Sequence, residues 1–140
     1  MTLLSFASMY VLMYAMVNVF ANALPNVNQF YMAGLMTMPM VLIELALMGG
    51  MYPDKKRNVL IMVASAVALV AFWVLIRQQV AVGDEQFLKS MVPHHAGAIL
   101  MCEKAALRDP EVLELCRGIV SGQQAEIEQM KERLRILSKD

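Results

Sequence analysis

The sequence predicts an all-α membrane protein, with three transmembrane helices followed by an antiparallel helical hairpin. Of its 140 residues 59% are hydrophobic and 17% are charged, whereas roughly 25% are charged in an average soluble protein. The charges are unevenly placed, since Glu44 is the only one before Asp54 and most follow Arg77. We therefore expect a transmembrane domain over residues 1–78 and a water-exposed helical hairpin over residues 79–140.

Three apolar segments are long enough to cross a bilayer, which takes roughly 20 residues. They are Leu3–Leu24, Phe30–Met51 and Val59–Ile76, and only the second contains a charged residue, Glu44. An ionisable group within a span is costly and usually faces a partner or a cavity. Glu44 is therefore either a structural contact between helices, which we favour, or part of a transport path.

The connectors between these segments predict the orientation. The first connector, PNVNQ, carries no charge, whereas the second, YPDKKRN, contains Lys55, Lys56 and Arg57. Positive residues concentrate on the cytoplasmic side of a membrane. We expect a multi-pass protein of the bacterial inner membrane, embedded in the lipid bilayer, with a cytoplasmic N-terminus and a periplasmic C-terminal domain. The net charge of zero gives no reason to expect nucleic acid as a partner.

The water-exposed half is predicted to form two helices joined by a short loop. Asp84 is a candidate N-cap of the first, which we expect to end near Leu107; Asp109 and Pro110 suit the N-cap and first position of the second. The second helix carries apolar residues at alternating spacings of three and four: Leu113, Cys116, Val120, Gln123, Ile127, Met130, Leu134 and Leu137. The matching positions of the first are Phe87, Met91, His94 or His95, Ala98, Met101 or Cys102, and Ala105.

A short loop makes the two helices antiparallel neighbours. With the turn centred near Asp109, Cys102 is expected opposite Cys116, and His95 opposite Gln123. Two helices bury too little surface to be stable alone. The hairpin therefore either docks on the spans or pairs with a second copy into a four-helix bundle, and we favour the homodimer.

Both histidines lie in the segment MVPHHAGAILMCEKA, residues 91–105. Pro93 removes one backbone hydrogen bond and leaves the Lys89 carbonyl without its usual donor. Adjacent helical side chains point about 100° apart, so one histidine can face the hairpin interior and the other a neighbouring chain. Imidazole with thioether and thiolate sulfur suits Cu(I), and the spacing typical of zinc fingers is absent. The spacing alone is equally compatible with solvated or core histidines that bind nothing.

The segments FLKSMVPHHAGAILMCEKA and DPEVLELCRGIVSGQQAEIEQM resemble the domain of unknown function 305 family. The resemblance covers about residues 84–131, and the N-terminal half is similar to the membrane-anchored branch. It implies a ferritin-like helical bundle that binds copper, and also silver, through Met and His. The candidate ligands that it implies are Met91, His94, His95 and Met130, with Glu126 in addition. Nearby soft side chains are Met101, Cys102 and Cys116, and the two cysteines either form a disulfide, which we favour, or add two ligands.

These features predict a membrane-anchored protein that captures copper, as Cu(I), on the periplasmic side. An alternative is a copper transport or channel component, because ten of the fourteen methionines lie between Met9 and Met62. Methionine is also an ordinary filler of irregular packing. A helical assembly module without metal is the third interpretation. We expect no enzyme activity, since neither histidine has a Glu three residues before it, as the ferritin-like carboxylate oxidases require.

Overall fold

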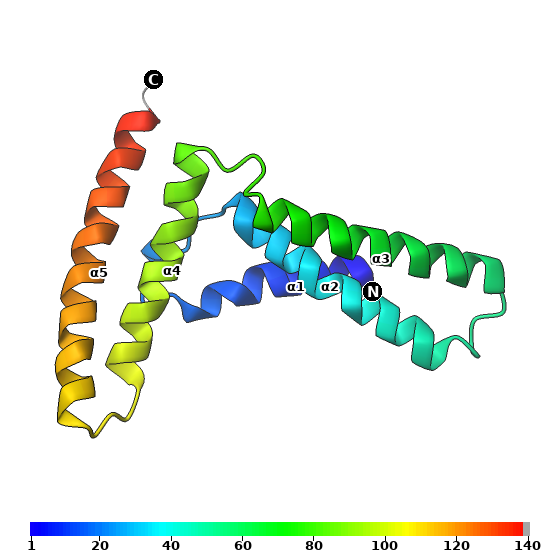
Figure 1. Cartoon of the computed structure of the whole chain (residues 1–140), viewed down its shortest axis with the longest axis horizontal. Coiled ribbons are helices and arrows are strands. Elements are labelled where there is room, and N and C mark those ends of the chain that lie inside the picture. The colour runs from blue at the N-terminus through cyan, green and yellow to red at the C-terminus, as the bar shows by residue number, and fades with distance from the viewer. Residues whose placement is uncertain (139–140) are drawn as a thin grey trace. The chain divides into compact units, whose positions relative to one another are not determined.

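The computed structural model describes residues 1–138 and contains five α-helices, two short 3-10 helices and no strand in that range (Figure 1). The all-helical prediction is confirmed. The elements are α1 (Thr2–Leu12), η1 (Met13–Met16), η2 (Phe20–Asn22), α2 (Val27–Met48), α3 (Lys55–Arg77), α4 (Asp84–Lys104) and α5 (Pro110–Leu137). The chain forms two compact units. The first contains Met1–Met13 and Val27–Ala81, and the second contains Tyr14–Asn26 and the chain from Val82 onward.

Two helices in the described part of the chain are long and apolar enough to cross a membrane. They are α2, with 22 residues, and α3, with 23 residues. The prediction of a third span over Leu3–Leu24 is wrong, because α1 has only 11 residues and a membrane crossing takes roughly 20.

Two asparagines explain why the first apolar segment does not continue as one helix. The Asn18 Oδ1 atom accepts hydrogen bonds from the Val19 amide, at 2.9 Å, and from the Asn22 side-chain amide, at 2.7 Å. Local side-chain bonds of this kind offer the backbone an alternative to helical hydrogen bonding. The chain leaves the helical path after η1, and residues 14–26 belong to the hairpin unit.

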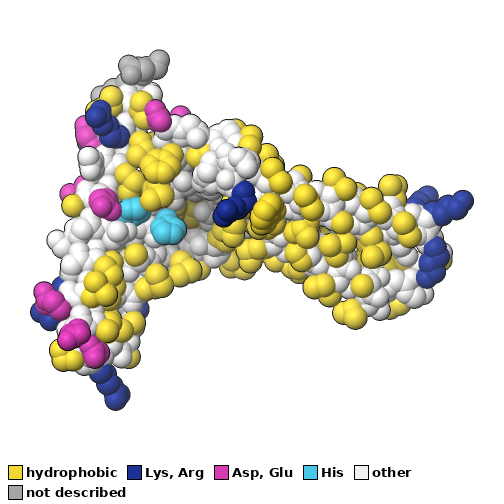
Figure 2. Space-filling model, viewed as in Figure 1, with side chains coloured by type: hydrophobic (Ala, Val, Ile, Leu, Met, Phe, Trp, Pro, Cys, Tyr) yellow, Lys and Arg dark blue, Asp and Glu magenta, His cyan; other side chains and the backbone are white. Residues whose placement is uncertain are grey.

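Within the first unit α2 contacts both α1 and α3. A Cβ atom at Gly34 would lie 2.5 Å from the ring of Phe72 on α3, so the missing side chain allows this close approach. The buried hydroxyl of Thr37 donates to the Ala33 carbonyl and lies 3.6 Å from the sulfur of Met9 on α1. Hydrophobic side chains cover much of this unit's surface on the face shown in Figure 2, as a bilayer contact requires.

Glu44 lies near one end of its helix. Helix α2 ends at Met48, four residues later, and the Tyr52 hydroxyl donates to the Glu44 carboxylate at 3.3 Å. The segment Phe30–Met51 had suggested a more central position. The partner of Glu44 therefore lies in the connector after α2 and not on another helix.

The second unit contains the hairpin of α4 and α5, packed with residues 14–26. Val92, Ala96, Ile99 and Ile127 form its buried core, and Val17 and Leu24 pack against this core together with Val120 and Met130. The Lys131 ammonium donates to the side-chain oxygen of the buried Asn22. A segment of the same chain therefore supplies part of the apolar partner that the hairpin needs.

The helix ends of the hairpin follow the expected capping chemistry closely. The Asp109 carboxylate accepts from the amides of Glu111 and Val112, and Pro110 is the first residue of α5, as predicted. Helix α4 has Gly83 rather than Asp84 at its N-cap, and it ends at Lys104 rather than near Leu107. Asp84 lies instead in the first turn, where a negative charge is favourable.

Candidate metal site

Both ring nitrogens of His95 have partners, one on its own helix α4 and one on α5. Its Nδ1 atom lies 2.9 Å from the Met91 carbonyl oxygen, one turn earlier on α4. Its Nε2 atom lies 2.8 Å from a carboxylate oxygen of Glu126 on α5. The sequence placed His95 opposite Gln123, so the true partner lies about one helical turn further along.

The contact with the Met91 carbonyl defines the hydrogen on Nδ1. A carbonyl oxygen only accepts hydrogen bonds, so Nδ1 must carry a hydrogen. The Nε2 atom then either carries a second hydrogen, which it donates to the Glu126 carboxylate, or accepts a hydrogen bond from a protonated Glu126 carboxyl group. Ligating histidines usually donate their other ring N–H to a carbonyl or carboxylate, which fixes the tautomer and the ring orientation. The Met91 carbonyl thus prepares Nε2 as the atom that a metal ion would bind.

The site is buried on the imidazole side and open on the carboxylate side. The His95 side chain is 11% exposed, whereas that of Glu126 is 55% exposed. The Gln123 side-chain amide also lies 3.4 Å from the same Glu126 oxygen. Half-exposed ion pairs contribute little to stability, so we expect this pair to contribute little to folding and to be reachable by an ion from solvent.

The methionines implied by the family resemblance lie close to this pair in sequence. Met91 precedes His95 by one turn on α4, and Met130 follows Glu126 by one turn on α5. The Met130 side chain packs against the hairpin core and is half-buried. Residues four apart lie on the same face of a helix, and because the helices are antiparallel, Met91 and Met130 both lie about one turn from the pair in the same direction.

Two other predicted ligands lie away from this pair. The His94 side chain is exposed, and its ring centroid is 6.2 Å from that of His95. Met101 is 55% exposed and lies almost two turns further along α4. The structure brings together His95 and Glu126, but it brings neither His94 nor Met101 to the same point.

The cysteines form a disulfide between the two helices. Cys102 and Cys116 are bonded, with their Cα atoms 5.3 Å apart, which agrees with the predicted register at this level of the hairpin. Thiolates are the form in which cysteine binds metal. Neither cysteine can therefore bind a metal ion as a thiolate while the disulfide is intact. In this structure the cysteines form the disulfide and do not add two soft ligands.

Few of the side chains that commonly bind metal ions lie close together in the described part of the chain. Within residues 1–138 no group of three or more His, Cys, Asp or Glu side chains could hold a metal ion together. Among the His, Cys, Asp and Glu side chains of that range, His95 and Glu126 meet at a single point.

Comparison with known proteins identifies the family. A family described as a domain of unknown function, DUF305, matches residues 47–134. The chain belongs to the DUF305 family. The match to DUF305 begins near the end of α2 and includes α3 and the whole of α4, so it extends beyond the hairpin that carries the histidines.

A relative supports the assignment along nearly the full chain. It is an uncharacterized protein of Acanthamoeba polyphaga mimivirus, 31% identical over 140 residues, which cover 96% of this chain and 88% of the relative. No solved structure matches the chain. The similarity therefore covers both the first unit and the hairpin.

Proposed function

We propose that this DUF305 chain is a membrane-anchored protein that binds copper, as Cu(I), through its helical hairpin. The observation that carries the proposal is the arrangement of His95, whose Nδ1 atom is held by the Met91 carbonyl while Nε2 meets Glu126. This backbone anchor is typical of metal-ligating histidines. The proposed role is capture or handling of the ion, and the same set also suits Ag(I).

The chemistry of the neighbouring side chains favours a soft ion. Thioethers select Cu(I), and imidazole suits copper as well as zinc. Zinc in structural sites usually has four Cys or His ligands, and such a cluster is absent within residues 1–138. In the proposed site His95 supplies nitrogen, Met91 and Met130 supply sulfur, and the Glu126 carboxylate either binds or compensates the charge.

The proposed orientation places the hairpin on the outer side of the membrane. Lys55, Lys56 and Arg57 lie at the start of α3, beside the connector from α2, and basic connectors stay cytoplasmic. With two spans, the ends of α2 and α3 that lead to the hairpin both emerge opposite that connector. In a bacterium this side is the periplasm, where the hairpin could meet incoming metal and where a disulfide is stable.

Transport is the second candidate function. Met1, Met40, Met48 and Glu44 line a cavity of about 350 Å³ in the first unit. Met32, Met36 and Met40 are exposed on the surface of this unit, so within one chain they do not enclose a path. This observation favours capture, and a transport path would need thioethers from several copies.

The test of copper binding uses the full-length chain in detergent. We would titrate Cu(I) against a competing chelator, with ascorbate as a reductant that spares the disulfide. The wild type is compared with His95→Ala and Glu126→Gln, and Glu128→Gln is the matched control, because Glu128 is an exposed carboxylate of the same helix. Loss of a ligand or of its supporting group typically costs about 10- to 100-fold in metal affinity.

We expect His95→Ala to weaken Cu(I) binding by at least about tenfold, Glu126→Gln to weaken it less, and Glu128→Gln to leave it unchanged. Equal affinities of the wild type and His95→Ala would refute the proposed site. A loss that Met40→Leu/Met48→Leu causes and His95→Ala does not would favour transport through the first unit instead.

A further inference from the structure

The open end of the hairpin, away from the disulfide, contains a cavity of about 350 Å³. Residues of the first turns of α4 and the last turns of α5 line it: Asp84, Phe87, Leu88, Arg133, Ile136 and Leu137. Sites for small molecules have volumes of roughly 300–1,000 Å³. All six residues belong to the hairpin unit, so one compact unit of the chain forms this cavity.

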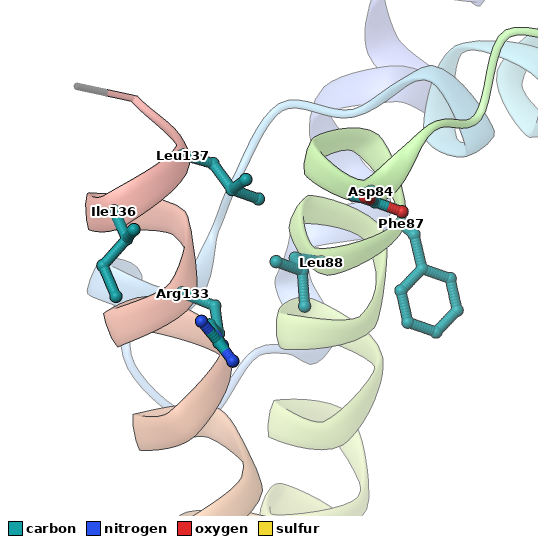
Figure 3. Close-up of a pocket in the computed structure, with 6 residues that line it drawn as sticks. All are labelled: Asp84, Phe87, Leu88, Arg133, Ile136 and Leu137. Atoms are coloured by element: carbon teal, nitrogen blue, oxygen red, sulfur yellow. The ribbon is translucent and has the colours of Figure 1, made fainter. Parts of the chain in front are cut away.

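The cavity is lined mainly by apolar side chains. Four of the six lining residues are Phe, Leu or Ile. Figure 3 shows Leu88 of α4 and Leu137 of α5 turned toward the space between the two helices, which Arg133 enters from α5. Phe87 is 50% exposed and Leu137 is 40% exposed. A ligand with an apolar chain would remove this surface from water, which is favourable.

Arg133 is the cation of this cavity, and it has no ion-pair partner within residues 1–138. Residues three and four positions apart are neighbours on a helix, and at these distances from Arg133 the chain has a glutamine, a methionine, an isoleucine and a leucine. Arg117 and Arg135 of the same helix each pair with a glutamate three residues earlier. The Arg133 guanidinium is therefore available to an anion.

Asp84 supplies a negative charge at the same cavity, from the first turn of α4. In the described part of the chain it forms no ion pair, whereas its neighbour Glu85 pairs with Lys89. Figure 3 shows Asp84 beside Phe87 on α4, while the cation comes from α5. Because complementary charge decides which partner binds, two unpaired charges of opposite sign favour a ligand that carries both.

The connector that leads from α3 to this cavity is short, and its first part is held by α2. The Tyr31 hydroxyl donates to the Val80 carbonyl at 2.9 Å, and the side-chain amides of Asn28 and Gln79 exchange two hydrogen bonds. Asp84 follows Val80 by four residues, which extend over at most about 14 Å. In the proposed two-span anchor, lipid headgroups are therefore within reach of this end of α4.

We propose that the cavity binds a phospholipid of the bilayer that has a primary ammonium in its headgroup, as phosphatidylethanolamine does. The Arg133 guanidinium binds the phosphate, whose geometry its fork of N–H donors matches. The Asp84 carboxylate accepts from the ammonium, and Leu88 and Leu137 contact an acyl chain. The membrane origin of this ligand rests on the proposed function, whereas the cavity and its charges do not.

A lipid titration of the full-length chain in detergent, followed by native mass spectrometry, tests the site. The three lipids have identical acyl chains and an ethanolamine, choline or glycerol headgroup. Choline has no N–H donor and glycerol has no cation, so we expect the wild type to bind the ethanolamine lipid most tightly. Hydrogen bonds to charged groups are strong, and their loss lowers affinity by about tenfold or more.

Arg133→Gln should therefore weaken the binding of all three lipids by at least about tenfold. Asp84→Asn should reduce the affinity for the ethanolamine lipid to that for the choline lipid. Arg135→Gln and Glu85→Gln are matched controls, because these residues form exposed ion pairs, and both should bind like the wild type.

Equal affinities of the wild type for the three lipids would overturn the proposal. So would an Arg133→Gln variant that binds like the wild type, provided that it keeps the native disulfide and the wild-type circular dichroism. Lipids that bind only to the apolar surface of α2 and α3 would give the second result.

Photolabelling in nanodiscs locates the bound lipid. An ethanolamine phospholipid with a diazirine in its acyl chain should label residues 84–88 and 133–137, and Arg133→Gln should lose these adducts while Arg135→Gln keeps them. Adducts confined to α2 and α3 would overturn the site. If the wild type binds no Cu(I) but prefers the ethanolamine lipid, the copper function fails and the lipid site stands. If the chain does not insert into membranes but keeps this preference, the anchor fails and the cavity remains a site for this amphiphile.

Discussion

At the scale of single residues, Pro93 leaves a backbone carbonyl of α4 without its helical donor, and a side chain distant in sequence lies near that carbonyl. A proline in a helix cannot donate to the carbonyl four residues earlier, which here is Lys89. The Asn26 side-chain amide lies 3.5 Å from that carbonyl and 2.9 Å from the Leu24 carbonyl. Asn26 is buried, with 6% of its surface exposed. It thus ties residues 14–26 to the turn of α4 that carries the histidines.

The first prediction concerns this contact. Asn26→Ala removes a buried donor and should destabilise the hairpin unit by about 1–3 kcal/mol. In a Pro93→Ala background the backbone amide of residue 93 can again serve the Lys89 carbonyl, so the cost of Asn26→Ala should be smaller. A double-mutant cycle of unfolding free energies, followed by circular dichroism in detergent, measures this coupling.

Asn28→Ala is the control for that cycle, because Asn28 bonds to Gln79 at an exposed position of the first unit. Its cost should be the same with Pro93 or Ala at position 93. Additive effects of Asn26→Ala and Pro93→Ala would show that the two residues do not share the Lys89 carbonyl.

At the scale of elements, the disulfide holds α4 and α5 together near their connecting loop. Cys102 and Cys116 are separated by 14 residues. A crosslink that closes a loop of this length stabilises by about 3 kcal/mol, chiefly by restricting the unfolded chain. The bond therefore matters for a hairpin whose core is small.

The second prediction follows from this bond. Cys102→Ser/Cys116→Ser should lower the free energy of unfolding of the hairpin by about 3 kcal/mol, while Cu(I) affinity measured in ascorbate stays unchanged. A thiol reductant should destabilise the wild type and leave the double variant unaffected, which serves as the control. A fall in copper affinity in the double variant would instead show that the disulfide helps to hold the metal site in place.

The elements show what the sequence could predict. The two long apolar helices and the α5 N-cap at Asp109 follow from hydropathy and capping chemistry, and both are present. The first segment was mispredicted because a sum of hydropathy over Leu3–Leu24 hides the local bonds of Asn18 and Asn22. The burial of Val17 and Leu24 against the hairpin core depends in addition on residues far away in sequence.

The candidate metal site was also only partly predictable from the sequence. The motif placed both histidines on one helix, but spacing alone could not decide which one faces α5. That choice depends on the rotation of α4 and on a shift of about one turn in the pairing of the hairpin helices. The structure resolves it in favour of His95 and gives it Glu126 as partner.

At the scale of the whole molecule, the proposed two-span anchor returns the chain to the side from which α2 started. The third prediction is therefore that the hairpin and the connector between α2 and α3 lie on opposite sides of the membrane, with the basic connector inside. Gly50→Cys in the connector and Gly118→Cys on α5 are matched probes, because a Cβ atom at either position meets nothing within 4 Å.

A membrane-impermeant maleimide applied to right-side-out vesicles measures this topology. The native cysteines do not react with it because they form a disulfide. Gly118→Cys should react in intact vesicles, and Gly50→Cys should react only after permeabilisation. Labelling of both positions from the same side would contradict a two-span anchor.

The most direct test of copper binding at His95 is X-ray absorption spectroscopy of the full-length chain loaded with one equivalent of Cu(I). We predict a first shell of nitrogen and sulfur with the outer-shell scattering of imidazole, and loss of imidazole scattering in His95→Ala. A shell without sulfur, or a spectrum that His95→Ala leaves unchanged, would contradict a copper site built on this histidine.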